Sequence, residues 1–229
     1  MIHQQTCVRY VNGQIGYGVY ATAPIPKGTI VYVRDPFETE ISPDGFGAME
    51  ECYRQVAEKY SFIDEKGYRV LSWDAAKYVN HCCNFNSISA GFGFEIAVRD
   101  IAAGQELTDD YGLFNLDHDM FCCCGSSNCR RIVRSSDVDR YCRRWDRVVI
   151  DALKYLRQVN QPLWPFMDAD TKKSLCDYLD GRGRYVSVRK LKPAAAGRFS
   201  RAARRFAEVP APAAVAQRVA LGERCAAAG

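Results

Sequence analysis

Residues 76–86 read AKYVNHCCNFN and residues 98–112 read VRDIAAGQELTDDYG, and these two stretches decide the fold. The first carries a dense polar patch directly after a short apolar run. The second carries the turn signal AAGQ before a segment that ends in LTDDYG. Between them, four apolar residues alternate with small or charged ones: Phe92, Phe94, Ile96 and Val98. This period of two predicts a strand and a hairpin, so the region is β-rich.

The same pattern extends toward the N-terminus. Residues 6–33 alternate apolar and polar positions and are interrupted repeatedly by glycine and proline, which predicts short strands joined by tight turns. Residues 47–60 predict a short helix, and residues 68–73 predict a further strand. The N-terminal half is therefore expected to consist mainly of small strands.

Toward the C-terminus the apolar spacing changes to three and four residues. We predict a helix of about five turns over residues 137–158, with its N-cap at Ser136 or Asp137, and a shorter helix over residues 168–179. From residue 192 onward the sequence is rich in Ala, Arg and Pro and poor in large apolar residues. We expect 192–229 to be a mostly disordered tail, with transient helix at most over 198–207.

Composition limits the class of protein. The 229 residues suffice for one full domain with an appendage, and 48% apolar residues support a packed core. A formal net charge of +4 is too mild to indicate more than weak nucleic-acid contact. The first residues contain no signal-peptide core, and no uncharged run approaches the ~20 apolar residues of a membrane span. We expect a cytoplasmic protein without membrane contact, or a nuclear one if its source is eukaryotic or it is delivered to a host.

Cysteines are clustered in a way that favours metal binding. Several of the eleven fall into CC at 82–83 and CCCGSSNC at 122–129, and clustered thiols without a signal peptide indicate metal ligands rather than disulfides. Three thiolates of the second cluster can converge on one tetrahedral zinc ion: Cys122, Cys124 and Cys129. Structural zinc takes four ligands, and spacing leaves four candidates for the last: Cys82, Cys83, Cys123 and His118.

Two other features are ambiguous when taken alone. The glycines of GYG at 16–18 allow close approach of a ligand but serve any hairpin equally, and without a following helix and a third glycine they are no dinucleotide-binding motif. Tyr111 ends a predicted strand, where a phenol is ordinarily a hydrogen-bonded core residue.

In order along the chain, four segments resemble the signature segments of SET-domain methyltransferases with a post-SET zinc motif: GYGVYA, AKYVNHCCNFN, VRDIAAGQELTDDYG and FCCCGSSNCRR. The resemblance covers roughly residues 6–133. It implies a mostly β, β-clip-like fold of small curved sheets with a pseudo-knot, a zinc lobe and a helical C-terminal part. We expect the SET domain over 6–113, the post-SET motif over 118–134 and a helical extension over 136–185.

The resemblance also implies roles for individual residues. Tyr111 is expected to be the catalytic tyrosine, and Cys83 the fourth zinc ligand beside Cys122, Cys124 and Cys129, which leaves Cys82 and Cys123 as non-ligands. S-adenosyl-L-methionine, the implied methyl donor, would be bound by these residues: Gly16, Tyr17, Gly18, Lys77, Tyr78, Asn80 and His81. Backbone and side-chain groups of Asn80 and His81 would hold its amino and adenine groups.

The implied activity is methylation of a lysine in a protein substrate, a histone tail or another basic protein, by a monomeric enzyme. Presenting a neutral lysine at pH 7 costs about 4 to 5 kcal/mol, so an apolar channel and the nearby sulfonium would have to lower its pKa. We assign Tyr111 to orienting the amine rather than to removing its proton. The rival interpretation is a non-catalytic SET-like module that contacts chromatin through its zinc lobe and basic tail.

Several positions depart from the family pattern. Asp109 stands where Phe or Tyr is usual, a position linked to the number of methyl groups added; a carboxylate there could hold the substrate ammonium or a water, or point to solvent. Phe85, Cys82 and Lys77 replace the usual proline, serine and arginine. The short chain suits a bacterial-type stand-alone enzyme whose target is recognised by residues 35–72 and the C-terminal lobe.

Overall fold

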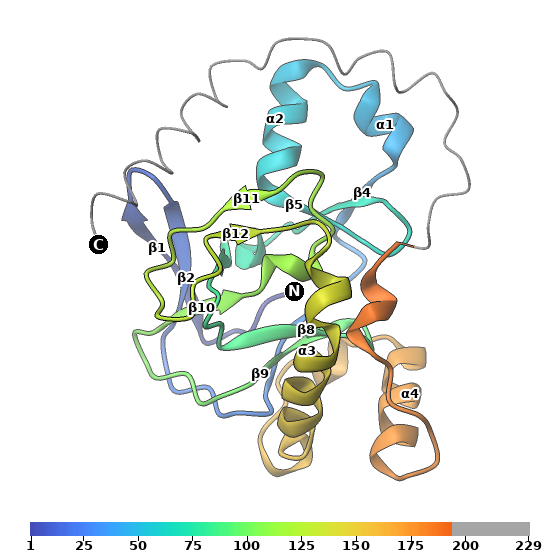
Figure 1. Cartoon of the computed structure of the whole chain (residues 1–229). Coiled ribbons are helices and arrows are strands. Elements are labelled where there is room, and N and C mark those ends of the chain that lie inside the picture. The colour runs from blue at the N-terminus through green and yellow to red at the C-terminus, as the bar shows by residue number, and fades with distance from the viewer. Residues whose placement is uncertain (194–229) are drawn as a thin grey trace.

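The structure is a computed structural model of the chain and describes residues 1–193 (Figure 1). The predicted transient helix over 198–207, and all but the first two residues of the predicted tail over 192–229, lie outside the described residues. The architecture is mostly β with a helical C-terminal part, as the sequence predicts. No helix in the described part is long and apolar enough to cross a membrane.

Within residues 1–193, short strands form four small sheets. The strands are β1 (Thr6–Asn12), β2 (Gly16–Ala21), β3 (Ile30–Val33), β4 (Thr39–Ile41), β5 (Ser61–Ile63), β6 (Arg69–Leu71), β7 (Asn80–His81), β8 (Ser87–Ala90), β9 (Phe94–Ala97), β10 (Glu106–Asp109), β11 (Met120–Phe121) and β12 (Ile132–Val133). The sheet orders are β1-β2-β10-β7, β3-β9-β8, β4-β6-β5 and β11-β12. Most neighbours are antiparallel, but β7 and β10 are parallel, with Thr108 opposite Asn80 and Asp109 opposite His81.

Helices occupy an insert and the C-terminal part. The insert holds α1 (Pro43–Gly47) and α2 (Glu51–Tyr60), and the C-terminal part holds α3 (Asp137–Leu153) and α4 (Ala169–Leu179). Single 3-10 turns are η1 (Ala75–Tyr78), η2 (Tyr111–Leu113), η3 (Leu156–Gln158), η4 (Trp164–Phe166) and η5 (Val188–Leu191). The predicted helix over 47–60 is present as α2 but begins later, at Glu51. The predicted second C-terminal helix is confirmed as α4. Asp168 caps α4, and its side chain accepts the Thr171 N–H at 2.8 Å.

The long C-terminal helix is shorter than predicted, because α3 ends at Leu153 and the chain tightens into η3. At this point Gly28 packs so closely on Tyr155 that a Cβ on the glycine would lie 2.7 Å from the Tyr155 Cβ. The start also differs in detail. Ser136 is the N-cap but its side chain makes no capping hydrogen bond, and the Asp137 carboxylate accepts the Arg134 N–H at 3.1 Å instead.

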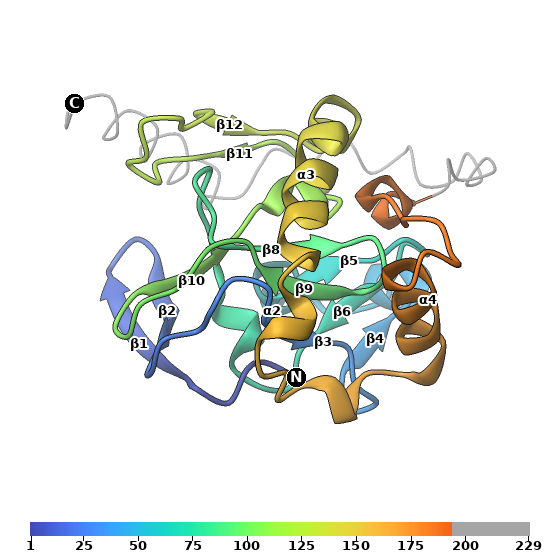
Figure 2. The same cartoon turned by 90° about the horizontal axis from the view of Figure 1, so that it is seen from below.

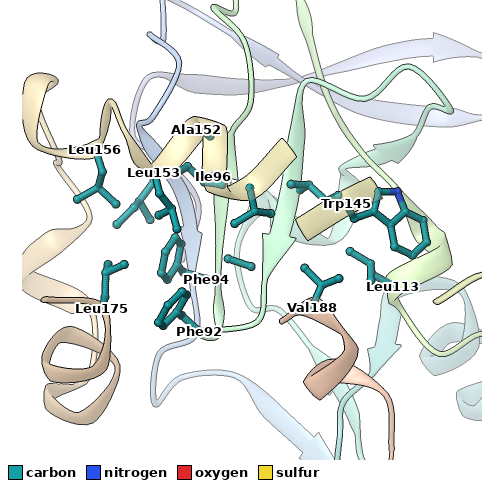
Figure 3. Packing of buried hydrophobic residues seen from close by; sticks show 14 of the residues in the cluster. Phe92, Phe94, Ile96, Leu113, Trp145, Ala152, Leu153, Leu156, Leu175 and Val188 are labelled. Carbon is teal, nitrogen blue, oxygen red and sulfur yellow. The ribbon is translucent and has the colours of Figure 1, made fainter. Parts of the chain in front are cut away.

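The largest core lies between the β3-β9-β8 sheet and the C-terminal helices. Figure 2 shows α3 crossing β8 and β9, with α4 beside it. Phe92 and Phe94 point toward Leu175 of α4, and Trp145 of α3, 2% exposed, lies beside Leu113 of η2 (Figure 3). The predicted alternation is thus confirmed on the buried face of β9, and α3 is fastened directly against the turn that carries Tyr111.

Candidate active site and metal centre

The parallel pairing of β7 and β10 brings together two motifs that lie about thirty residues apart in the sequence. Both strands end at the same edge, as parallel neighbours must, and the NH and DDY segments meet there. Tyr111 does not end the strand as predicted. It begins the turn η2, which is capped by Asp110 through a 3.0 Å hydrogen bond from the Gly112 N–H to Asp110 Oδ1.

Tyr111 is held from two sides. Its hydroxyl donates to the Val79 carbonyl at 2.6 Å, and its backbone N–H lies 3.2 Å from His81 Nδ1. Burial, together with the charges of Asp109 and Glu95, raises the pKa of Tyr111 well above the usual phenol range. The phenol is therefore neutral at physiological pH, and because its hydrogen is engaged, its oxygen lone pairs are what it offers a ligand.

The His81 side chain connects Tyr111 to the cysteines. Only 5% of this side chain is exposed, and burial lowers its pKa, so the ring is neutral. While Nδ1 faces Tyr111, Nε2 lies 3.3 Å from Cys83 Sγ. A metal-bound Cys83 thiolate would accept a hydrogen bond from Nε2–H and leave Nδ1 free to accept the Tyr111 N–H. Both ring nitrogens are engaged within the protein, which leaves the backbone of His81 for the predicted cofactor contact.

The glycine hairpin lies against the same edge. Asn80 Nδ2 donates to the Tyr17 carbonyl at 3.0 Å and to Glu106 Oε1 at 2.8 Å. A Cβ on Gly18 would lie 2.9 Å from Asn80 Nδ2 and closer still to Glu106, so only glycine allows this approach. Gly16 has a φ of +86° and open space where a side chain would be. The structure therefore gathers Gly16, Tyr17, Gly18 and Asn80 at one sheet edge.

Tyr78 and Lys77 lie on either side of this edge. The Tyr78 ring contacts the Tyr17 ring with centroids 5.8 Å apart, so Tyr78 joins the hairpin group. Lys77 instead lines a neighbouring cavity, and its ammonium lies 3.4 Å from the Trp73 carbonyl. Its ammonium also lies 5.6 Å from the centroid of the Tyr78 ring, so Lys77 contacts the group through Tyr78 while it lines the cavity.

A cavity of about 230 Å³ lies beside Tyr111. Its walls include the aromatic rings of Tyr60, Phe62 and Phe114, and the charged residues among its lining are Glu58, Lys59, Arg69, Lys77, Glu95 and Asp117. The Phe114 ring centroid is 5.1 Å from that of Tyr111 and 5.5 Å from that of Phe62. The aromatic rings beside the neutral phenol offer an apolar surface for a long aliphatic chain, and the charged residues offer contacts for a polar end.

Four cysteines converge next to this site. The sulfurs of Cys83, Cys122, Cys124 and Cys129 all lie within 4.8 Å of one another, a group that could hold a metal ion. Cys122 Sγ is 3.8 Å from Cys83 Sγ and 3.6 Å from Cys129 Sγ. Tetrahedral zinc with bonds of about 2.3 Å separates its sulfurs by about 3.8 Å, so the spacing fits. Of the four candidates for the distant ligand, Cys83 is in this group, and Cys82, Cys123 and His118 are not.

Backbone N–H groups donate to two of the sulfurs and would stabilise negative charge on them. Arg130 N–H lies 3.3 Å from Cys83 Sγ, and Arg131 N–H lies 3.4 Å from Cys129 Sγ. Burial nonetheless raises the pKa of the Cys83 and Cys122 thiols. Four thiolates in one place therefore need a cation, which is the role that zinc would fill.

Residues outside the predicted set also shape the site. Arg130 Nη2 lies 2.5 Å from Asp110 Oδ1, and Arg130 Nη1 lies 3.4 Å from Asp137 Oδ2. Asp109 is fully buried, so the option that it points to solvent is wrong; it lies near Glu95, on another strand. The positions of Asp110 and Arg130, next to Tyr111 and Cys129, were a local signal for them. Nothing in the local sequence around Glu95 indicated its place.

The β part of the chain is similar to known proteins. Residues 16–112 match the model of the SET domain family. Over 131 residues the chain is 32% identical to the histone-lysine N-methyltransferase trr of Drosophila melanogaster, covering 51% of the chain and 5% of that protein. It is 28% identical over 145 residues to the histone-lysine N-methyltransferase ATX2 of Arabidopsis thaliana, covering 56% and 13%. A histone-lysine N-methyltransferase of Cryptococcus neoformans, named as H3 lysine-36 specific, is 26% identical over 131 residues, covering 50% and 15%. The chain therefore spans only a small part of the length of these relatives.

Proposed function

Residues 16–112 of the chain form a SET domain, and on this premise we propose that the protein is a protein-lysine N-methyltransferase whose methyl donor is S-adenosyl-L-methionine. The observation that carries the proposal is the position of Tyr111. Its phenol lies on an aromatic cavity and donates to the carbonyl of Val79, and the next residue, Asn80, contacts the glycine hairpin through its side chain. One side of Tyr111 thus suits a lysine side chain, and the other suits a cofactor.

The chain's own residues would exclude water, favour the neutral form of the lysine and align the reacting groups. Phe62 and Phe114 exclude water from the aliphatic part of the lysine and favour its neutral form, since a low-polarity wall penalises the ammonium. The Tyr111 oxygen, neutral and unable to donate its engaged hydrogen, accepts contacts from the amine or from a polarised methyl group and aligns them. S-adenosyl-L-methionine would supply the electrophilic methyl group.

The residues that would hold the cofactor lie together at one sheet edge and include Gly16, Gly18 and Asn80. Gly16 leaves open space, and Asn80, the first residue of β7, donates through its side chain to the carbonyl of the adjacent Tyr17. Zinc would be held by Cys83, Cys122, Cys124 and Cys129 and would act structurally, because all four of its positions would be filled by protein. We propose a histone tail or another basic protein as the substrate, since the relatives are named for histone lysines.

The test is transfer of labelled methyl from S-adenosyl-L-methionine to histones and to whole-cell lysate proteins. Wild type is compared with Tyr111→Phe, which keeps the ring and removes the oxygen. We expect labelled lysine in the wild-type reaction and a loss of at least 100-fold in the variant, or about 2.7 kcal/mol. Equal labelling by both proteins would overturn the role of Tyr111. A wild type that binds the cofactor by calorimetry but labels nothing would favour the rival, a non-catalytic module.

A further inference from the structure

Two carboxyl groups meet at the cavity beside Tyr111. Glu95 lies in the middle strand of its sheet, directly opposite Tyr32 on β3 and Ser89 on β8, so the three side chains form one row across the sheet. The Asp109 carboxyl, at the end of β10, lies 3.5 Å from the Ser89 hydroxyl and hydrogen-bonds with the carboxyl of Glu95. Glu95 lines the cavity, and Asp109 is fully buried behind it. We call Glu95 and Asp109 the carboxyl pair.

Within residues 1–193 the carboxyl pair forms no ion pair with a lysine or arginine. Arg34 is paired with Glu38, Glu40 and Asp64, and Arg69, which lines the same cavity as Glu95, is paired with Asp117. Two ionised carboxylates in contact at low polarity would repel strongly, so at neutral pH the pair shares a proton. A buried acidic pair without a cation costs free energy and adds nothing to packing that apolar residues would not supply better.

We propose that the carboxyl pair receives the terminal ammonium group of the substrate lysine in the cavity and that Glu95 takes its proton. This inference rests on the proposed function and names the proton acceptor that Tyr111 cannot be. In the step, an N–H bond of the ammonium breaks and an O–H bond forms on Glu95. The nitrogen keeps the electron pair with which it attacks the methyl carbon, and the proton leaves Glu95 through the cavity mouth.

The protonation of the carboxyl pair suits this role. Burial raises the pKa of Glu95 to about 7, and burial together with the charge of Glu95 raises the pKa of Asp109 well above its usual range. Glu95 is therefore protonated below about pH 7 and ionised above it, so acceptance of a proton requires the higher pH. Asp109 remains the protonated partner that hydrogen-bonds to the Glu95 carboxylate.

Other titratable groups around the carboxyl pair raise or lower the pKa values of its two members. The Met1 ammonium lowers the pKa of Glu95, and Glu38 raises it. Asp110 raises the pKa of Asp109, while Tyr32 and Tyr111 are neutral phenols with pKa values raised by burial. Asp110 is itself paired with Arg130. On the cavity side, the charged residues that share the lining with Glu95 are Glu58, Lys59, Arg69, Lys77 and Asp117.

The first experiment needs neither cofactor nor protein substrate. The full chain is labelled with ¹³C at side-chain carboxyls, and its NMR titration is recorded with and without n-butylammonium, which mimics the end of a lysine side chain. We expect a carboxyl that titrates near pH 7, is absent in Glu95→Gln, titrates at a changed pH in Asp109→Asn, and moves to lower pH by at least 0.5 units with butylammonium. Absence of any such carboxyl, or no response to butylammonium, overturns the proposal. Two separate variants keep the test valid if one fails to fold, as judged by thermal melting.

The second experiment measures kcat/KM for histone methylation against pH. In wild type we expect activity to rise through about pH 7; Glu95→Gln should lose this rise and at least 10-fold in rate, and Asp109→Asn should move the rise. Glu50→Gln is the matched control, because this exposed carboxylate makes no capping hydrogen bond to α2. If Glu95→Gln and Asp109→Asn both showed the same dependence of kcat/KM on pH as the wild type, the inference would be overturned and the proposed function would stand. An inactive wild type would refute the proposed function, and the butylammonium titration would still decide ammonium recognition.

Discussion

Arg130 Nη2 lies 2.5 Å from Oδ1 of Asp110, and this contact joins the cysteine cluster to the turn that carries Tyr111. The same guanidinium lies 3.4 Å from Asp137 at the start of α3, and its backbone N–H faces the sulfur of Cys83. Its carbon lies 5.2 Å from the ring centroid of Tyr141. One arginine therefore holds three segments together: the metal lobe, the η2 turn and the C-terminal helix.

Arg130→Gln should break this connection. Removing one member of a buried ion pair leaves Asp110 uncompensated, so we expect the free energy of unfolding to fall by about 3 to 5 kcal/mol. Denaturant unfolding measures the change. Arg130→Lys, which keeps the charge but not the forked geometry, should recover only part of it. Arg134→Gln, at an exposed pair 3.8 Å from Asp119, is the control and should change stability by less than about 1 kcal/mol. A loss at Arg130 no larger than at Arg134 would contradict the connecting role.

Cys124→Ser should remove bound zinc. A serine hydroxyl is a poor replacement for a thiolate, and a structural zinc site with three sulfurs is much weaker. Elemental analysis of the purified protein should find one zinc per chain in wild type and a substoichiometric amount in the variant. Cys82→Ser, next to Cys83 but outside the sulfur group, should retain one zinc per chain. Full metal content in the Cys124 variant would exclude this residue as a ligand.

Trp145→Ala should destabilise the fold through a cavity. The side chain is 2% exposed and packs against the η2 turn, where a Cβ on Gly112 would already lie 2.8 Å from its ring. We expect a loss of about 3 to 5 kcal/mol in the free energy of unfolding. Trp73→Ala, at a half-exposed tryptophan, should cost much less. Similar losses at both positions would mean that the α3 interface is less tightly packed than described.

Asp109→Asn should change the pH dependence of stability in a defined direction. The folded-state pKa of Asp109 is raised above its unfolded value, so the folded protein binds the extra proton, and this residue costs stability increasingly as pH rises above about 4. Asparagine cannot ionise and carries no such cost. The stability of the variant relative to wild type should therefore improve from pH 5 to pH 8 in chemical denaturation. A constant difference, or one that falls with pH, would show that Asp109 does not hold a raised pKa.

Much of the local structure followed from sequence pattern. Alternation around Phe94 predicted β9, and apolar spacing of three and four residues predicted α4. Cys122, Cys124 and Cys129 were near enough in sequence to be recognised as one group. These predictions hold because backbone propensity, side-chain period and short spacing act over a few residues. The end of α3 was missed, because the contact of Tyr155 with Gly28 involves residues far apart in the chain.

The sequence by itself determined the order of the motifs, the small strands and three of the four converging cysteines. Spacing left the fourth cysteine open, the family resemblance pointed to Cys83, and the structure brings its sulfur into the group. Only the tertiary structure decided that Asp109 turns inward to Glu95 and that Arg130 reaches Asp110. The physical reason is strand pairing between distant segments. The parallel pairing of β7 with β10 positions Asp109, and the pairing of β8 with β9 positions Glu95. These contacts depend on the path of the whole chain, and local residue preferences carry no record of that path.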